Sequence, residues 1–426
     1  MVSCPCAGGQ VGTQTCNEDG SGWADCGPCT PGFEAADGAG SSNSGSSTTI
    51  DAAAADAQPD GASHDAALDA GTSADTQDAA PDTGHSESCT PCGTGSVKGI
   101  ICAPSEQVYV GNAHVTVSVI GCDGLPATLE TWSGPDGSYW FPEVPCGLHK
   151  VYVSAGSFTN QYTIDVKTGK TTDLSGVGKK QCFKANAVPI AVFWGQWDHQ
   201  HELLDQLGFD FTYYEFEWEY FNDVDPDDIE AVQVLRDPAL LAQYKVLFFN
   251  CGSAPLKYVH SYPEIADNLR EFVLGGGSLY ASDLAWAYLE AAFPDAFDFY
   301  GSVDLPKTPM ANDGPQQAAS NVSIPCTILD PKLSEYVGVG TFTAKYGPGP
   351  LIAVEAPGPG SAVHVSAAVK FEDPAPFKDY FTLIQPVVLS HQPQPGAGRL
   401  VYTTFHNDEQ ADSVMLKILY YLVFTL

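Results

Sequence analysis

The hydrophobic pattern of the chain changes near residue 95 and again near residue 189. Between residues 95 and 176, short segments alternate apolar and polar residues and are separated by Gly, Asn and Asp turns. A period of two is typical of strands that bury one face. We therefore expect an antiparallel β-sandwich within residues 89–183. The segments that carry this pattern are VKGIIC, HVTVSVI, SYWFPEV, HKVYVSA and QYTIDVK.

After Pro189 the pattern becomes an alternation of buried strands and amphipathic helices. The strand-like runs include IAVFW, KVLFFN, SLYAS and GRLVYTTF. This alternation predicts an α/β domain over residues 188–426, with a flavodoxin-like, doubly wound parallel sheet covered by helices on both faces. Residues 300–380, approximately, are rich in Pro and Gly and contain short strands. We interpret them as an insertion over the end of the sheet, forming a lid or a ligand-shaping subdomain.

The first 88 residues differ from the rest in composition. Residues 1–29 hold five cysteines, which predicts a small module stapled by disulfides. Zinc is the alternative interpretation of the two C-x-x-C pairs, Cys26/Cys29 and Cys89/Cys92, although no His lies at finger spacing. Residues 30–88 consist largely of Ala, Asp, Gly, Ser and Thr. Such a segment cannot bury enough apolar surface to fold, so we expect a disordered acidic linker.

Charge narrows the classes of partner. The chain has 18 Lys and Arg against 52 Asp and Glu, a net charge of −34. Residues 1–97 contain 14 acids and no Lys or Arg, which leaves 34 − 14 = 20 negative charges for the remainder. This balance excludes nucleic acid as a partner and disfavours anionic membranes and anionic small ligands. A neutral sugar or a cation suits the chain better.

Cysteine usage indicates the compartment. Eleven of the 13 cysteines precede residue 183, which favours disulfides and therefore an exported protein, located extracellularly, on the outer cell surface or in the periplasm. No signal peptide is visible at residues 1–4, so we expect the true N-terminus to lie upstream or the start to be miscalled. Cys4 is a candidate lipoprotein attachment site. No apolar run reaches the ~18 residues needed to span a bilayer.

Two segments in the first 156 residues resemble known families. Residues 3–29 resemble short cysteine segments of exported proteins from some environmental Gram-negative bacteria, which implies a bacterial source and a structural role. The string GPDGSYWFPEVPCGLHKVYVSAG, residues 134–156, resembles the carboxypeptidase-regulatory-like (prealbumin-like) domain family. That resemblance implies a prealbumin-like or immunoglobulin-like sandwich that serves as a stalk, an adhesion module or a carbohydrate-binding appendage. The candidate disulfide cysteines here, with open connectivity, are Cys102, Cys122, Cys146 and Cys182.

The second half of the chain resembles another family. The segments LLAQYKVLFFNCG, LREFVLGGGSLYASDLA and VYTTFHNDE are similar to class I glutamine-amidotransferase-like and ThuA-like domains. The resemblance implies a sharp elbow after the strand SLYAS, where amidotransferases carry a nucleophilic Cys. Here Ser282 stands at that place, and the family's His-Pro-Glu has no clean counterpart. Glutaminase activity is therefore not expected. ThuA-like relatives, linked with sugar metabolism, are the closer comparison.

Ligands of such sheets bind beyond the carboxyl ends of the strands. Our main hypothesis is a binding protein for a ligand such as a carbohydrate or cell-envelope glycan, without catalysis. Its candidate ligand-binding residues are Trp197, Asp198, Asn250 and Asp283.

The alternative hypothesis is a hydrolase acting on a carbohydrate-related or acyl substrate. Ser282 would be the nucleophile, His406 the base and Glu409 the orienting acid. A helix-capping role for Ser282 is the competing structural interpretation, and a negative charge on Asp283 would oppose an oxyanion.

A metal is the remaining candidate, and no organic cofactor is expected. His199 and His201 form a His-x-His pair that could bind a metal with His406 and a carboxylate from Asp198 or Asp283. Alternatively, Asp198 caps a helix and both histidines lie in its solvated first turn. We also considered a disulfide between Cys251 and Cys326. The aromatic and acidic segment at 209–221 fits a half-buried strand better than a sugar-stacking surface.

Overall fold

The computed structural model divides into two compact units, residues 1–82 and 83–426. In the first unit, β1 (Val2–Pro5) and β2 (Val11–Gln14) pair as antiparallel strands. The rest of the predicted cysteine module and the linker at 30–88 lie outside the described residues. The structure describes residues 2–5, 11–14, 93–121, 125–216, 225–252, 254–300, 322–346, 351–372, 380–406 and 413–426.

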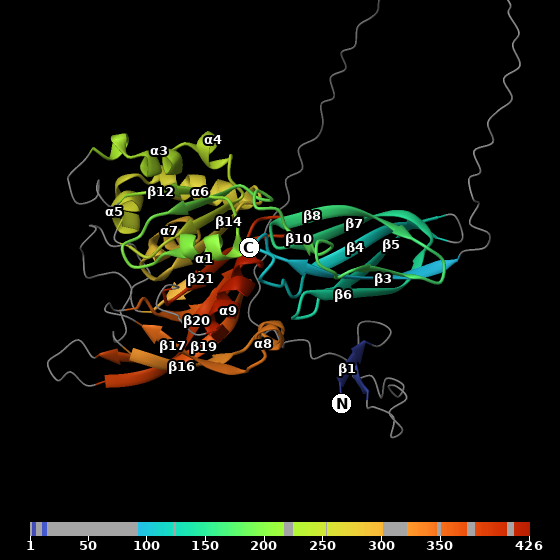
Figure 1. Cartoon of the computed structure of the whole chain (residues 1–426). Helices are drawn as coiled ribbons and strands as arrows, with labels where there is room; N and C mark the ends of the chain where they lie inside the picture. The colour runs from blue at the N-terminus through green and yellow to red at the C-terminus, as the bar shows by residue number, and fades with distance from the viewer. Residues whose placement is uncertain are drawn as a thin grey trace, which may run out of the picture. The chain divides into compact units, whose positions relative to one another are not determined.

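The first part of the second unit consists of two four-stranded sheets (Figure 1). In one sheet β3 pairs with β6, β9 and β10, and the other has the order β5-β4-β7-β8. Their inward residues, such as Val97, Val117 and Phe141, belong to one hydrophobic cluster. Along these strands, the apolar residues of the alternating sequence pattern are therefore the buried ones, and the polar residues are the more exposed ones. The strands are β3 (Thr94–Cys102), β4 (His114–Ile120), β5 (Pro126–Trp132), β6 (Ser138–Pro145), β7 (Gly147–Ala155), β8 (Phe158–Val166), β9 (Thr171–Leu174) and β10 (Gln181–Cys182).

The turn before β6 explains the spacing of the DG-x-Y-x-F segment. Gly137 has a φ of +73°, and a Cβ there would lie 2.3 Å from the Ile101 carbonyl oxygen. Glycine is therefore required on both conformational and steric grounds. The backbone amide of Ser138 donates to Asp136, and Tyr139 and Phe141 then both point into the core.

A disulfide between Cys102 and Cys182 joins β3 to β10. It is one of the pairings that the sequence left open. Cys122, another candidate, lies outside the described residues. The bridge fixes the end of the first sheet next to the start of the α/β domain.

The α/β domain is built on a nine-stranded mixed sheet with the order β12-β11-β13-β14-β21-β20-β19-β16-β17. The first five strands in this order are parallel. Four of them, including β11 and β13, are buried at every position, as expected for strands covered on both sides. The parallel strands are β11 (Ile190–Phe193), β12 (Thr212–Tyr214), β13 (Val246–Phe249), β14 (Ser278–Ser282) and β21 (Leu400–Thr403).

Helices cover both faces of this parallel half, which is the doubly wound arrangement that the sequence predicts. Val192 and Phe248 share a cluster with residues of α1 and α9, whereas Ala191 and Phe249 share another with residues of α3, α5, α6 and α7. None of the helices in the described part of the chain is both long and apolar enough to cross a membrane. The helices are α1 (Gln200–Leu207), η2 (Pro226–Asp228), α3 (Glu230–Arg236), α4 (Pro238–Leu241), α5 (Ala254–Ser261), α6 (Glu264–Leu274), η3 (Asp283–Ala285), α7 (Trp286–Ala292) and α9 (Ser413–Val423).

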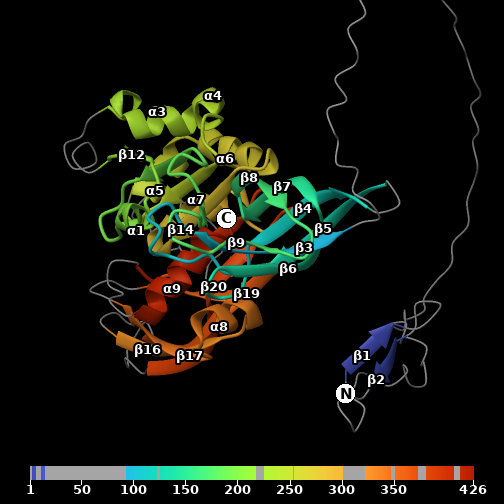
Figure 2. The same cartoon turned by 45° about the vertical axis from the view of Figure 1, so that its right-hand side comes forward.

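The other half of the sheet is antiparallel, which corrects the expectation of a parallel sheet throughout (Figure 2). The short connections from β19 to β20 and from β20 to β21 require antiparallel pairing of these strands, because parallel neighbours need a long crossover. Much of the predicted insertion therefore extends the sheet instead of covering its end. The elements are β16 (Val322–Ile328), α8 (Pro331–Val337), β17 (Thr341–Tyr346), β19 (Ser361–Glu372) and β20 (Tyr380–His391), with a separate pair of β15 (Phe297–Phe299) and β18 (Val354–Pro357).

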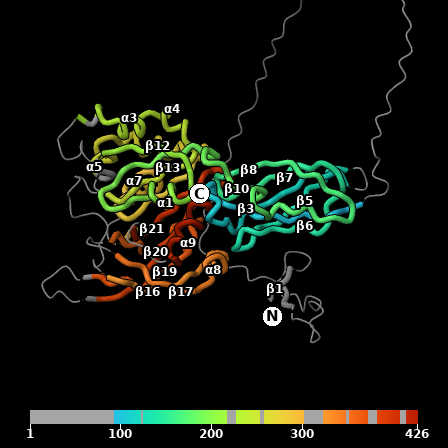
Figure 3. The backbone as a smooth tube through the Cα atoms, in the orientation of Figure 1, coloured from blue at the N-terminus to red at the C-terminus, as the bar shows by residue number. Residues whose placement is uncertain are grey.

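A cluster of four phenylalanines joins the β-sheets of residues 94–182 to the α/β domain. Figure 3 shows the backbone of these two parts, which follow one another along the chain. The ring of Phe158 on β8 lies 4.7 Å from that of Phe209 and 5.3 Å from that of Phe424, and Phe183 stacks on Phe424 at 5.7 Å. The Ser157 amide also donates to the Leu426 carbonyl. The two parts therefore share a continuous core.

We predict that Phe158→Ala lowers the free energy of unfolding by about 3–5 kcal/mol, because it empties the centre of this cluster. Urea denaturation of the full chain measures the loss. Leu148→Ala, at an exposed position of the neighbouring β7, is the matched control and should change stability by less than about 0.5 kcal/mol. Equal losses in the two variants would contradict a shared core.

Candidate functional site

The carboxyl ends of four parallel strands bring polar side chains to one edge of the sheet. Asp198 follows β11, Cys251 follows β13, Ser282 and Asp283 lie at the end of β14, and His406 follows β21. Parallel strands end at the same edge, so these residues meet although they are far apart in sequence. Glu409, the predicted orienting acid, lies outside the described residues.

The Ser282 hydroxyl is the hub of a buried hydrogen-bond network. It donates to Asp198 Oδ2 over 2.6 Å and accepts from Gln200 Nε2 and from the Cys251 amide, both over 3.1 Å. Ser282, Asp198 and Gln200 are fully buried. None of the partners of Ser282 in the described part of the chain is a histidine, so the predicted pair with His406 is not formed. Ser282 instead ties three segments of the edge together.

Asp283, and not Ser282, occupies the strained position of the elbow. Its φ is +42°, in the left-handed region that non-glycine residues rarely adopt. Asp283 Oδ1 accepts from the Ile352 amide over 2.7 Å, and its carbonyl accepts from the Tyr402 hydroxyl over 3.0 Å. These contacts hold the residue in a conformation that local preference disfavours.

The second oxygen of Asp283 faces a thiol and an imidazole. Oδ2 lies 3.1 Å from His406 Nε2 and 3.4 Å from Cys251 Sγ. Burial raises the pKa of the Cys251 thiol well above its usual value, and the charges of Asp283 and Asp198 raise it further. A thiol in this environment stays protonated at neutral pH and is a poor nucleophile.

The disulfide considered between Cys251 and Cys326 is wrong. Both cysteines are buried and carry free thiols, and the Cys326 thiol donates to the Ile324 carbonyl over 3.4 Å. Cys251 points into the parallel edge while Cys326 lies on β16 in the antiparallel half, so the mixed sheet separates them.

The start of α1 places the remaining predicted residues. The Asp198 carboxylate accepts from the His199 amide over 2.8 Å, and the Asn250 side chain accepts from the Gln200 amide over 3.0 Å. Asn250 is 1 % exposed, so it holds the first amide of α1 and does not line an open surface. Trp197 is 41 % exposed.

The two histidines of the H-x-H pair do not join His406. The His199 and His201 rings are 5.6 Å apart, and His201 packs on Tyr213 of β12 at 4.7 Å. Within the described ranges, the residues that gather as a set of three metal-ligating groups are instead Cys251, Asp283 and His406.

Sequence reasoning missed a second surface, on the β-sheets of residues 94–182. We call Tyr152, His114, Trp132 and Trp140 the aromatic strip. His114 lies opposite Trp132 in the pairing of β4 with β5, and their rings stack at 4.4 Å. Trp132 and Trp140 are 53 % and 48 % exposed. The signal was present in the sequence, because both tryptophans occupy outward positions of alternating strands.

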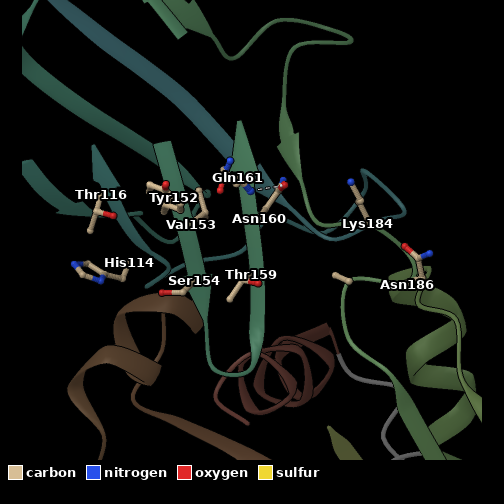
Figure 4. Close-up of a pocket in the computed structure, with 11 residues that line it drawn as sticks. His114, Thr116, Tyr152, Val153, Ser154, Thr159, Asn160, Gln161, Lys184 and Asn186 are labelled. Atoms are coloured by element: carbon tan, nitrogen blue, oxygen red, sulfur yellow. Dashed lines mark hydrogen bonds between the residues drawn. The ribbon is translucent and has the colours of Figure 1, made fainter. Parts of the chain in front are cut away.

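Two grooves flank the aromatic strip. One, of about 550 Å³, is lined by Trp132 and Trp140 together with Lys98, Thr131 and Ser138. The other, of about 650 Å³, is lined by polar groups around His114 and Tyr152 (Figure 4). Figure 4 shows Lys184 and Asn186 at the end of this groove away from His114.

No family model and no curated protein matches the chain. Solved structures do show similarity to it. A protein described as ThuA-like from Bacteroides uniformis is 13 % identical over 55 % of this chain and 89 % of its own, with a TM-score of 0.33. A glutamine amidotransferase from Thermotoga maritima is 10 % identical over 52 % of this chain and 76 % of its own, with a TM-score of 0.30. A β-galactosidase from Bacillus circulans is 12 % identical over 54 % of this chain and 30 % of its own, with a TM-score of 0.28.

The similar structures thus include both kinds of protein that the sequence resemblance named for the α/β domain. Identities and TM-scores at this level carry no argument about activity or ligand.

We predict that Ser282→Ala destabilises the protein by about 1–3 kcal/mol, because it removes the hydrogen bonds that Ser282 makes to three buried groups. Chemical denaturation measures the effect. Ser118→Ala, at an exposed position on β4, is the control and should stay within about 0.5 kcal/mol of the unmodified protein. A variant at Ser282 as stable as the control would contradict the structural role of this hydroxyl.

Proposed function

We propose that the protein binds a neutral carbohydrate along the aromatic strip and that its α/β domain does not hydrolyse glutamine. The observation that carries the proposal is the exposure of Trp132 and Trp140 on the walls of one groove. Exposed aromatic surface next to polar groups is typical of ligand-binding sites. No aromatic ring or cation stacks on Trp140 within the described residues, so a face of its ring is available to the apolar side of a sugar.

The polar lining of this groove suits an uncharged, hydroxyl-rich ligand. Lys98 forms an ion pair with Asp173 over 2.9 Å, which neutralises the one cation in the lining. Thr131, Ser138 and Ser175 supply hydroxyl groups. A strongly acidic chain disfavours polyanions, so a neutral glycan fits both the local and the overall charge.

The stacked rings of Trp132 and His114 connect the two grooves, which favours an oligosaccharide over a single sugar. His114, stacked on Trp132, lines the second groove, and Tyr152 on β7 points to the same side of the sheet. Asn160, Gln161 and other amide or hydroxyl groups complete that groove (Figure 4). A chain of several sugar units could contact both grooves at once.

The edge of the α/β sheet supports binding less well. Asp198, Asn250 and Asp283, which the sequence suggested as ligand-binding residues, are buried and bonded to protein groups. Ser282, the predicted nucleophile, is fixed by hydrogen bonds, and the buried thiol of Cys251 is protonated. Export to the cell surface or periplasm remains part of the proposal, and the Cys102–Cys182 disulfide supports it.

We predict that Trp140→Ala weakens binding to the best ligand of a glycan array by at least about tenfold, because the stacking surface is lost. Trp132→Ala should weaken binding less, because the Trp132 ring already stacks on His114 and has Lys332 Nζ 4.9 Å from its centroid. Isothermal titration calorimetry on the full chain measures both. Trp197→Ala is the matched control, since Trp197 is similarly exposed but lies at the edge of the α/β sheet.

The control also discriminates between the two sites. Unchanged affinity in Trp197→Ala together with loss in Trp140→Ala supports the aromatic strip. Loss in Trp197→Ala with retained binding in Trp140→Ala would move the ligand to the sheet edge and contradict the proposal.

We also expect no release of ammonia from glutamine by the purified chain, because the Cys251 thiol is protonated and buried. A coupled glutamate assay measures this. Glutaminase activity that disappears in Cys251→Ala would show that the thiol acts as a nucleophile after all.

A further inference from the structure

We propose that Cys251, Asp283 and His406 form a centre for a divalent cation of the zinc type at the carboxyl edge of the parallel sheet. This centre is separate from the aromatic strip and from the His199–His201 pair. Its ligand atoms would be Cys251 Sγ, Asp283 Oδ2 and a ring nitrogen of His406, which all lie within 4.8 Å of one another. Sulfur, carboxylate oxygen and imidazole nitrogen are the three protein ligands that zinc accepts.

The distances suit a tetrahedral ion. With a zinc–sulfur bond of about 2.3 Å and zinc–oxygen and zinc–nitrogen bonds of about 2.1 Å, sulfur and oxygen are about 3.6 Å apart and nitrogen and oxygen about 3.4 Å apart. The corresponding distances here are 3.4 Å and 3.1 Å. The sulfur–oxygen and nitrogen–oxygen distances thus need to lengthen by only a few tenths of an ångström to hold the ion. A rotation of the His406 ring would adjust the remaining distance, between its nitrogen and the sulfur of Cys251.

The scaffold already orients the central ligand. The Ile352 amide holds Asp283 Oδ1, the Tyr402 hydroxyl holds the Asp283 carbonyl, and the left-handed backbone turns Oδ2 toward the other two residues. Outer hydrogen bonds that fix a ligand in this way are a regular feature of metal sites. Strained residues also concentrate at functional sites.

The charge of the site favours a cation. Asp283 is 4 % exposed, and its ion-pair partner among the described residues is His406. The buried carboxylate supplies negative charge at the centre, and a bound cation would take over the pairing that His406 now provides. The His406 side chain is 13 % exposed, so this ligand is the one of the three that lies nearest the surface. On binding, the Cys251 thiol proton would pass to solvent, since the thiolate is the ligand.

The test uses the full chain, freed of metal by a chelator and titrated with Co²⁺ as the spectroscopic probe. We expect a thiolate-to-cobalt charge-transfer absorption from Cys251. Because eleven other cysteines precede residue 183, the readout is the difference between variants and not the total metal content. Cys251→Ala should bind one equivalent of cobalt less and should lack the charge-transfer absorption. Cys326→Ala, which changes the other buried thiol, should keep both the bound cobalt and the absorption.

A second variant keeps the test decisive if Cys251→Ala does not fold. His406→Gln alters a partly exposed side chain and should weaken cobalt binding at this centre at least about tenfold, with an unchanged circular dichroism spectrum. Zinc should likewise raise the melting temperature of Cys326→Ala but not that of His406→Gln. The proposal is overturned if Cys251→Ala or His406→Gln folds and binds cobalt as the unmodified protein does.

Discussion

The carboxylate of Asp283 is the contact on which the edge of the α/β sheet depends. One of its oxygens binds the Ile352 amide, and the other faces Cys251 after β13 and His406 after β21. A single side chain thus connects three strands of the parallel half with the segment that leads into β18. The left-handed backbone of Asp283 costs on the order of 1–3 kcal/mol, and these contacts offset that cost. The same residue therefore shapes the elbow.

The contacts of Asp283 also distinguish two surfaces. The sequence alone had placed both ligand binding and metal binding at the edge of the α/β sheet. At the sheet edge, polar groups are buried and satisfied by one another, which suits a structural core or an enclosed ion. On the β-sheets of residues 94–182, Trp132 and Trp140 lie in the open beside hydroxyls and a neutral ion pair. We therefore propose the open surface, and not the sheet edge, as the place where a large neutral ligand binds. The phenylalanine cluster around Phe158 joins the β-sheets of residues 94–182 and the α/β domain into one core, which supports both surfaces.

The sequence predicted the elements that depend on local pattern. Apolar runs such as IAVF and VLFF predicted buried parallel strands. The alternation of polar and apolar residues at 114–120 predicted a strand with one buried face. It could not predict features that depend on long-range pairing or on a single dihedral angle. The antiparallel half is one example, because β16 and β19 pair across about 40 residues. The elbow is another example. The sequence does not tell whether Ser282 or Asp283 takes the strained backbone position, and only the φ of +42° at Asp283 decides it. The sequence also gave no indication that Gln200 belongs to the buried network around Ser282, because a buried glutamine cannot be told from an exposed one in a sequence.

Amide hydrogen exchange of the full chain, with and without the glycan selected on an array, tests the central claim most directly. Binding on the aromatic strip predicts slower exchange in peptides that cover 126–145 and unchanged exchange in peptides that cover 278–292. The reverse result, protection at 278–292 with none at 126–145, would contradict the account and return the ligand to the edge of the α/β sheet.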